Sequence, residues 1–343
     1  MKKLWLHSVR AYIGLGLFFY YKKIQVIKSE TIPKDKPVLF LSNHQNALLD
    51  ALLIATTNSR FSYFLTRASV FNKSIISKLL NSLRMLPVYR VRDGWGKITN
   101  NNSIFETCTA LLKKGEAVAL FPEGSHNLNR TVRTLSKGFT RIVFDSLEKF
   151  PDLDLQLIPV GVNFEDATAF GDSCTIYYGN AIPANYFVFN DRNQAVIKLK
   201  KDLQSKISEL TTHIESDVYG ETLDKLNSIH ADFLEPKKVN ACIASNFSEC
   251  NFKNKKERTF LKKALKGLLI LNLIMPYAIW KLVITPKIVE IEFVGTFRFA
   301  IAITLVPIWI LIIVIILAST FGLLYGVAYL VFVLCLTLIA IKS

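Results

Sequence analysis

The stretch Val38-Leu39-Phe40-Leu41-Ser42-Asn43-His44-Gln45-Asn46-Ala47-Leu48-Leu49-Asp50 decides the fold of this chain of 343 residues. Residues 38–42 are an unbroken, mostly apolar run, which predicts a strand covered on both faces of a sheet. A polar break over residues 43–46 follows, and the apolar run after it predicts a helix over residues 47–57. The stretch therefore predicts a corner at which a buried strand turns into a helix.

Asp50 is the one charged residue of that expected helix. Asn46 is suited to cap the helix, which puts Asp50 in the first turns, where the helix dipole favours a carboxylate. A buried carboxylate without a partner is costly, so a partner is expected. His44, between strand and helix, is the candidate, and the pair would form a base and the group that orients it.

Asn43 and His44 followed by Asp50, and then Phe121-Pro122-Glu123-Gly124, resemble the motifs of the glycerolipid (lysophospholipid) acyltransferase family. Two weaker blocks, residues 86–90 and 157–162, are similar to further family blocks and stand in the family's order. The resemblance covers residues 30–185 and implies an acyltransferase.

The spacing of the first motif departs from the usual family pattern, because five residues instead of four separate His44 from Asp50. The longer spacing resembles a branch that acylates glycerol 3-phosphate or dihydroxyacetone phosphate. It adds one residue to the corner. It also excludes a pair that meets on one continuous helix, where side chains meet at three or four residues apart.

The resemblance implies transfer of an acyl chain from a thioester, acyl-CoA or acyl-carrier protein, to a hydroxyl group. His44 would be the general base and Asp50 would fix its tautomer, with the acceptor hydroxyl replacing the serine of a triad. Glu123 would help to hold the acceptor; the alternative for Glu123 is a helix cap. Beyond the thioester co-substrate, no cofactor and no metal ion is expected.

Arg90 is the expected ligand of the acceptor phosphate, because a guanidinium binds phosphate through two hydrogen bonds. The alternative for Arg90 is a surface ion pair with Asp93. Gly124 permits close backbone approach to a ligand.

Ser125 and Lys137, together with Arg130 and Arg133, are expected at the phosphate or donor entrance. The alternative for these residues is a solvated charged face. His126 lies near the site, but its spacing indicates no role.

Strand and helix patterns alternate from residue 31 to residue 185, which predicts an α/β layered domain with a largely parallel sheet flanked by helices. Ligands bind beyond the carboxyl ends of such strands, where His44, Arg90 and Glu123 fall. The remaining expected strands cover residues 61–66, 85–89, 117–121, 157–163 and 175–178, and the remaining helices residues 72–83, 103–113 and 137–149.

Composition indicates a membrane protein with an anionic partner. Hydrophobic residues make up 51% of the chain and concentrate in its last part, and the net charge is +15. No nucleic-acid motif accompanies that charge, so an anionic membrane surface and a phosphorylated glycerol acceptor are the expected partners. The five cysteines show no metal-like spacing, and neither a disulfide framework nor a zinc site is expected.

Four regions are expected along the chain. The first, residues 1–30, is an N-terminal membrane-interfacial helix, too short in its apolar part for the about 20 residues of a span; the alternative is a helix packed on the soluble domain. The acyltransferase domain, residues 31–185, is followed by a polar helical extension, residues 186–266, with a basic juxtamembrane end. Residues 267–343 form the membrane region.

Within the membrane region, residues 299–317 and 321–341 are each long enough to span and form a hairpin. Residues 268–284 are expected to be re-entrant or interfacial. Because the basic residues flank the outer ends of the hairpin, the protein is expected in the membrane, with its catalytic domain on the cytoplasmic face.

The expected function is therefore acylation of glycerol 3-phosphate or lysophosphatidate at the membrane. Acylation of another lyso-lipid, such as a lyso-aminolipid, and a non-catalytic lipid-binding protein are the alternatives. A hydrolase with Ser42 as nucleophile is disfavoured, because Ser42 lies in a strand and no Gly-x-Ser-x-Gly motif occurs.

Overall fold

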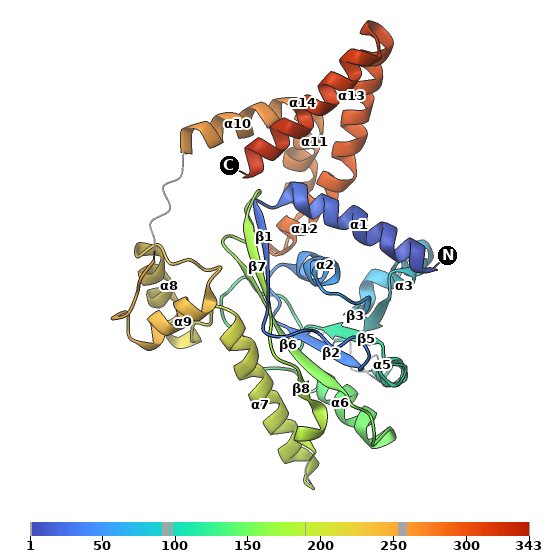
Figure 1. Ribbon diagram of the computed structural model, residues 1–343, viewed down its shortest axis with the longest axis vertical. Helices are drawn as coiled ribbons and strands as arrows, with labels where there is room; N and C mark the ends of the chain where they lie inside the picture. Colours follow the sequence, from blue (N-terminus) through green and yellow to red (C-terminus); the bar gives the residue numbers. More distant parts are fainter. Residues whose placement is uncertain (1, 91–95, 97–98, 189, 253–258, 343) are drawn as a thin grey trace.

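The computed structural model describes residues 2–90, 96, 99–188, 190–252 and 259–342. Within these residues, eight strands form one sheet at the centre of the protein (Figure 1). The strands are β1 (Lys23–Lys28), β2 (Val38–Ser42), β3 (Ser62–Arg67), β4 (Met85–Val88), β5 (Ala117–Leu120), β6 (Gln156–Phe164), β7 (Ser173–Tyr178) and β8 (Ile182–Pro183).

The strand order is β1-β7-β6-β2-β5-β3-β4, with β8 paired to β6. The pairing is parallel except where β6 meets β7 and β8. The predicted α/β fold with a largely parallel sheet is confirmed. Strand β2 lies between β6 and β5, so the His44 corner leaves the sheet from its interior.

Helices cover both faces of the sheet (Figure 1). They are α1 (Lys2–Tyr20), α2 (Ala47–Thr57), α3 (Ser74–Ser82), α5 (Asn101–Lys113), α6 (Gly138–Lys149), α7 (Arg192–Leu210), α8 (Tyr219–Ser228), α9 (Pro236–Ala244), α10 (Thr259–Asn272), α11 (Ile274–Ala278), α12 (Phe293–Ile303), α13 (Leu305–Phe321) and α14 (Leu323–Lys342).

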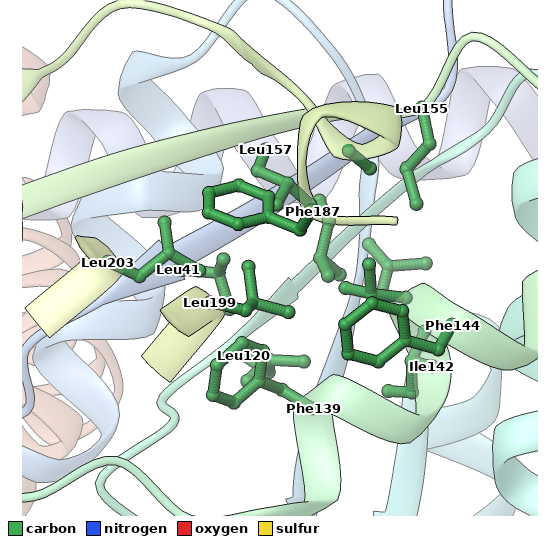
Figure 2. Packing of buried hydrophobic residues seen from close by; sticks show 14 of the residues in the cluster. Leu41, Leu120, Phe139, Ile142, Phe144, Leu155, Leu157, Phe187, Leu199 and Leu203 are labelled. Carbon is green, nitrogen blue, oxygen red and sulfur yellow. The ribbon is translucent and has the colours of Figure 1, made fainter. Parts of the chain in front are cut away.

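The side chains of β2 alternate between two separate hydrophobic cores. Leu39 and Leu41 point to one face, where they join residues of α5, α6 and α7. Figure 2 shows Leu41 there among residues of α6 and α7. Val38 and Phe40 point to the other face, where they join residues of α1, α2 and α12. Because successive side chains of a strand face opposite sides, one apolar run supplies both cores.

The N-terminal region differs from the expected single helix over residues 1–30. Helix α1 ends at Tyr20, and residues Lys23–Lys28 form the edge strand β1, paired in register with β7. The sequence Lys-Ile-Gln-Val-Ile-Lys is rich in β-branched residues, and the edge of β7 offers it a full set of backbone partners. The C-terminal end of α1 is also packed on the domain, since Leu17 and Tyr20 are buried.

The tail contains two helical stretches long and apolar enough to cross a membrane, Phe293–Phe321 and Leu323–Lys342. The expected span 299–317 lies within the first stretch, which consists of α12 and α13. Its first residues, 299–303, belong to α12, and Phe299 is buried against Tyr20. Helix α13 begins at Leu305. Helices α13 and α14 lie side by side, so they are able to form the expected hairpin (Figure 1).

Two further regions lie outside the α/β core. Residues 268–284, expected to be re-entrant or interfacial, belong to a bent pair of helical stretches, Phe260–Asn272 and Ile274–Lys287, which meet at 99°. Helices α8 and α9 enclose a small core of their own, in which Cys242 and Cys250 form a disulfide. The sequence predicted no disulfide framework and so did not indicate this bridge, which joins residues only eight positions apart, a spacing without a metal or framework signature.

Candidate active site

The site forms where the loops that follow β2 and β5 meet. These strands are parallel neighbours, so their carboxyl ends lie at the same edge of the sheet. Two backbone contacts join the loops: the His44 N–H donates to Glu123 Oε1 at 3.3 Å, and the Asn127 N–H donates to the His44 carbonyl at 3.0 Å. The structure thus brings His44 and Glu123 together.

His44 and Asp50 form the pair expected from the sequence. His44 Nδ1 lies 2.8 Å from Asp50 Oδ2, and the Asp50 side chain is fully buried while that of His44 is 16% exposed. The same oxygen accepts the backbone N–H groups of Gln45 and Asn46, each at 2.8 Å. Three donors therefore converge on Oδ2 and stabilise the buried charge, whereas Oδ1 is buried without a hydrogen bond among the described residues.

The five-residue spacing is accommodated by the corner itself. Ala47, the first residue of α2, has a φ of 40°, a left-handed conformation that is uncommon for alanine. Asn46 precedes the helix as expected, but among the described residues its side chain makes no capping bond and instead donates to the Ala167 carbonyl at 2.8 Å. The first helical N–H groups have other acceptors: that of Leu48 donates to Thr296 Oγ1 and that of Leu49 to the Asn46 carbonyl.

The geometry fixes the chemistry of the His44 ring. An ionised carboxylate only accepts hydrogen bonds, so Asp50 Oδ2 selects the tautomer protonated at Nδ1 and leaves Nε2 as a base. The ring stacks on Phe121, with centroids 4.0 Å apart and an interplanar angle of 13°. Phe121 thereby restricts rotation of the imidazole, and a base with a fixed orientation results.

Glu123 braces the loop through both of its oxygens. Oε1 accepts from the His44 backbone, and Oε2 accepts from Arg133 Nε at 2.7 Å. Burial raises the pKa of Glu123, and the hydrogen bond and charge of Arg133 oppose that rise. Gly124, with a φ of 77°, completes the turn and requires glycine for that reason.

Arg133 is more central than the sequence indicated. Besides Glu123, its guanidinium binds Ser125 through Nη1, which donates to Oγ at 2.8 Å. Arg130 has a different place: it donates to the carbonyls of Phe164 and Glu165 at 2.9 and 2.8 Å. Burial lowers the pKa of Arg130 to about 10. Of the two arginines, only Arg133 therefore contacts the site.

Within the described residues, neither Arg90 nor Lys137 forms a hydrogen bond with His44 or Asp50. Arg90 follows β4, three strands from β2 in the sheet order and so roughly 14 Å away at the usual strand spacing. Its alternative partner, Asp93, lies outside the described residues. Lys137 is exposed just before α6, next to Ser136, whose N–H donates to the Pro122 carbonyl at 2.7 Å. Both binding roles stay predictions.

Sequence reasoning missed Arg67, the last residue of β3. Strand β3 pairs with β5, so Arg67 lies nearer to the Glu123 turn than Arg90 does. Its guanidinium lies 5.1 Å from the ring centroid of Phe293. The rule that selected Arg90, a polar residue directly after a strand, also selects Arg67, so the signal was present.

The tail forms a roof over the site, which the sequence did not indicate. The rings of His126 and His44 meet edge to face at 5.6 Å, and His126 Nε2 lies 2.7 Å from Glu290 Oε2. Phe293 contacts the His126 ring at 4.9 Å. The Leu48 N–H, at the start of α2, donates to Thr296 Oγ1 of α12 at 3.3 Å. A polar pocket beside His44 is lined by Asn43, His44, Gln45, Glu123, Asn127, Asn129, Thr131, Val132, Thr211 and Thr212.

Ser42 does not have the setting of a nucleophile. It ends β2, is 1% exposed, and donates only to Asn43 Oδ1 at 3.5 Å among the described residues. A hydrolytic serine needs an exposed oxygen on a strained turn. The geometry therefore favours His44 over Ser42 as the candidate reactive side chain at this edge.

Comparison with known proteins gives the same assignment for this part of the chain. The family model for acyltransferases matches residues 23–163. The chloroplastic 1-acyl-sn-glycerol-3-phosphate acyltransferase LPAT1 of Arabidopsis thaliana is 26% identical over 130 residues, 38% of this chain and 34% of that protein. An uncharacterized acyltransferase of Schizosaccharomyces pombe is 32% identical over 77 residues, 22% of this chain and 11% of that protein.

Among solved structures, the 1-acyl-sn-glycerophosphate (LPA) acyltransferase PlsC of Thermotoga maritima is similar, with a TM-score of 0.44 and 16% identity. That match covers 63% of this chain and 83% of PlsC. The present chain thus spans about a third of the plant relative and a smaller part of the yeast one.

Residues 23–163, which match the acyltransferase model, carry His44, Asp50 and Glu123. The relatives that are similar to this part of the chain are themselves named acyltransferases.

Proposed function

We propose that the protein is a membrane-bound O-acyltransferase that transfers a fatty acyl chain from an acyl thioester to a hydroxyl of glycerol 3-phosphate or lysophosphatidate. The observation that carries the proposal is the His44–Asp50 pair, in which a fully buried carboxylate holds a partly exposed imidazole at 2.8 Å. A base that is oriented on one nitrogen and free to act on the other suits proton removal from a hydroxyl.

In the proposed reaction, His44 Nε2 removes the proton of the acceptor hydroxyl as its oxygen attacks the thioester carbonyl carbon. The C–S bond then breaks, and the imidazolium returns its proton to the departing thiolate. Asp50 stabilises the imidazolium between the two steps. The donor is acyl-CoA or acyl-carrier protein, used as a co-substrate, and no acyl-enzyme and no further cofactor is needed.

Cationic side chains at the same edge support a phosphorylated acceptor. Arg133 lies beside Glu123, and Arg67 ends the neighbouring strand β3. We propose Arg67 and Arg90 as candidates for the phosphate, because a guanidinium matches phosphate geometry. Lys137 and Ser125 would border the entrance.

The tail supports action at a membrane. The stretch Phe293–Phe321, formed by α12 and α13, and helix α14 are each long and apolar enough to cross a bilayer, and α12 contacts the start of α2 beside the site. We propose that both outer ends of the hairpin lie on the cytoplasmic side with the domain, since the basic residues flank those ends. The crevice would then stay close to the leaflet that holds a lipid acceptor.

The test is an acyl-transfer assay on the full chain in lipid vesicles. Glycerol 3-phosphate, lysophosphatidate and a lyso-aminolipid would each be offered with labelled acyl-CoA and with labelled acyl-carrier protein, and lipid products would be separated. Product from a phosphorylated acceptor that disappears in His44→Ala supports the proposal. Product from the lyso-aminolipid alone would identify a lyso-aminolipid, not a phosphorylated glycerol, as the acceptor. A folded protein that gives no product with any pair would favour the alternative of a non-catalytic lipid-binding protein.

A further inference from the structure

Helix α3 exposes its apolar residues to solvent. In α3, all of whose residues the structure describes, none is buried. Ile75 is 84% exposed, Leu79 47% and Ile76 41%. Large apolar side chains are normally scattered singly over a surface, whereas these three share one side of a short helix.

This apolar side continues onto α1. The Trp5 indole donates to Ser82 Oγ at 3.2 Å, which holds the start of α1 beside the end of α3. Along α1 a further set of large apolar side chains is exposed: Leu4, Trp5, Tyr12, Leu15 and Phe18. Figure 1 shows α3 beside the N-terminal end of α1, and α1 lying across the base of the α13–α14 hairpin. We call the exposed apolar residues of the two helices the α1–α3 surface.

The two segments of the chain that carry the α1–α3 surface contain basic residues and no acidic ones. Residues 60–90 contain six lysines and arginines and neither aspartate nor glutamate. Residues 1–28 likewise contain six basic residues and no acidic one. Lys73 and Lys78 of the α3 segment are exposed and form no ion pair within the described part of the chain. All 27 acidic residues of the chain therefore lie outside these two segments.

We propose that α3 lies on an anionic lipid leaflet together with α1, with Ile75, Ile76 and Leu79 below the headgroups. Lys73 and Lys78 would bind headgroup phosphates. Exposed apolar residues flanked by lysines are the pattern of an interfacial helix, which sinks its apolar side about 5–10 Å into the headgroup boundary. Each lysine near an anionic surface adds about 1 kcal/mol of attraction.

A lipid leaflet explains this surface better than a partner protein does, for two reasons. The surface is continuous with helix α1, which lies at the base of the apolar hairpin, so a bilayer that holds the hairpin also reaches it. The uniform positive charge matches anionic headgroups, whereas an interface between two copies of this chain would place like charges opposite one another. With α1, α3 and the hairpin as three contacts, the leaflet would fix the tilt of the domain.

The test places a fluorescent probe on α3 of the full chain in vesicles. The exposed Cys335 is first replaced by alanine, and Cys108 and Cys174 are buried. An environment-sensitive dye is then attached at Ile75→Cys or Leu79→Cys. In vesicles with anionic lipid, both probes should shift to the blue and be quenched several-fold more by nitroxide-labelled lipid than in detergent.

The matched control is Asn81→Cys on the same helix. Asn81 is exposed but lies roughly 160° around the helix from Leu79, on the other side. Its probe should stay in water and be quenched little. In Lys73→Glu/Lys78→Glu, quenching at position 75 should fall in anionic vesicles and change little in neutral ones.

Three results would overturn the inference. Equal quenching at positions 75 and 81 would show no preferred side, and a probe at 75 that stays in water in both vesicle types would show no lipid contact. A blue shift that appears already in detergent and grows with protein concentration would show a second copy as the occupant. Because the readout is a probe's environment, it does not depend on the proposed acyl transfer.

Discussion

Glu290 of the tail and His126 of the catalytic loop are joined by a contact of 2.7 Å between Oε2 and Nε2. His126 in turn meets the His44 ring edge to face at 5.6 Å. Burial lowers the pKa of His126, and the bond to Glu290 opposes that shift. The C-terminal tail is therefore part of the wall around the candidate base, and changes in the tail are expected to affect the chemistry.

The first prediction concerns the His44–Asp50 pair. His44→Ala should lower acyl transfer by about 10²–10⁴-fold, because general base catalysis contributes that much. Asp50→Asn should lose most activity as well, since the amide neither selects the Nδ1 tautomer as firmly nor stabilises the imidazolium. Turnover in vesicles measures both effects, with thermal unfolding as the check on folding. Near wild-type turnover in either folded variant would contradict the assignment.

The second prediction separates the two phosphate candidates. Arg90→Lys and Arg67→Lys each keep the charge and lose the two-pronged guanidinium. The variant at the true phosphate ligand should raise the acceptor KM by roughly 10- to 150-fold, since a charged hydrogen bond contributes roughly 1.5–3 kcal/mol. The donor KM should change less. If neither variant moves the acceptor KM, both residues lie outside the phosphate site.

The third prediction tests the roof through Gly295 of α12. A Cβ added there would lie 2.7 Å from Asn46 Oδ1 and 2.9 Å from Leu49 Cδ1. Gly295→Ala should therefore displace α12 or the His44 corner, at a typical overpacking cost of about 1–3 kcal/mol, and reduce turnover. Gly14→Ala in α1 is the control, because nothing lies within 4 Å of its added Cβ. Equal turnover in the two variants would show that the roof is dispensable.

The fourth prediction concerns the pH dependence of stability. Burial raises the pKa of Asp172 from 3.8 to about 7, and one of its oxygens accepts the Asp166 N–H at 3.0 Å. Between these two pKa values the native state binds more protons than the unfolded state, so stability is highest at low pH and falls as pH rises toward 7. Asp172→Asn keeps an oxygen that accepts the Asp166 N–H but removes the titrating group. The free energy of unfolding of this variant should therefore fall less between pH 5 and pH 8 than that of the unmodified protein.

Unfolding temperature in detergent at both pH values measures this effect. The exposed Asp224 supplies the control, since Asp224→Asn should change with pH as the unmodified protein does. A difference between pH 5 and pH 8 that is unaltered in Asp172→Asn would assign the pH dependence to another group.

The sequence by itself determined the strand and helix around His44. Strand β2 occupies the predicted residues 38–42, and α2 begins and ends where its apolar pattern does. The pairing of His44 with Asp50 also followed from local information, because a lone carboxylate on a buried helix needs a nearby partner. The two long apolar stretches of the tail were equally clear, since length and composition are properties of the sequence.

Only the tertiary structure decided which distant segments meet. Lys23–Lys28 became a strand because β7 offers a free edge 150 residues further along. Arg133 binds Glu123, and α12 packs on α2, through contacts that the hydrophobic periodicity of the sequence does not predict. Periodicity reports which face of an element is apolar, but the partner of that face is chosen by packing between elements far apart in the chain.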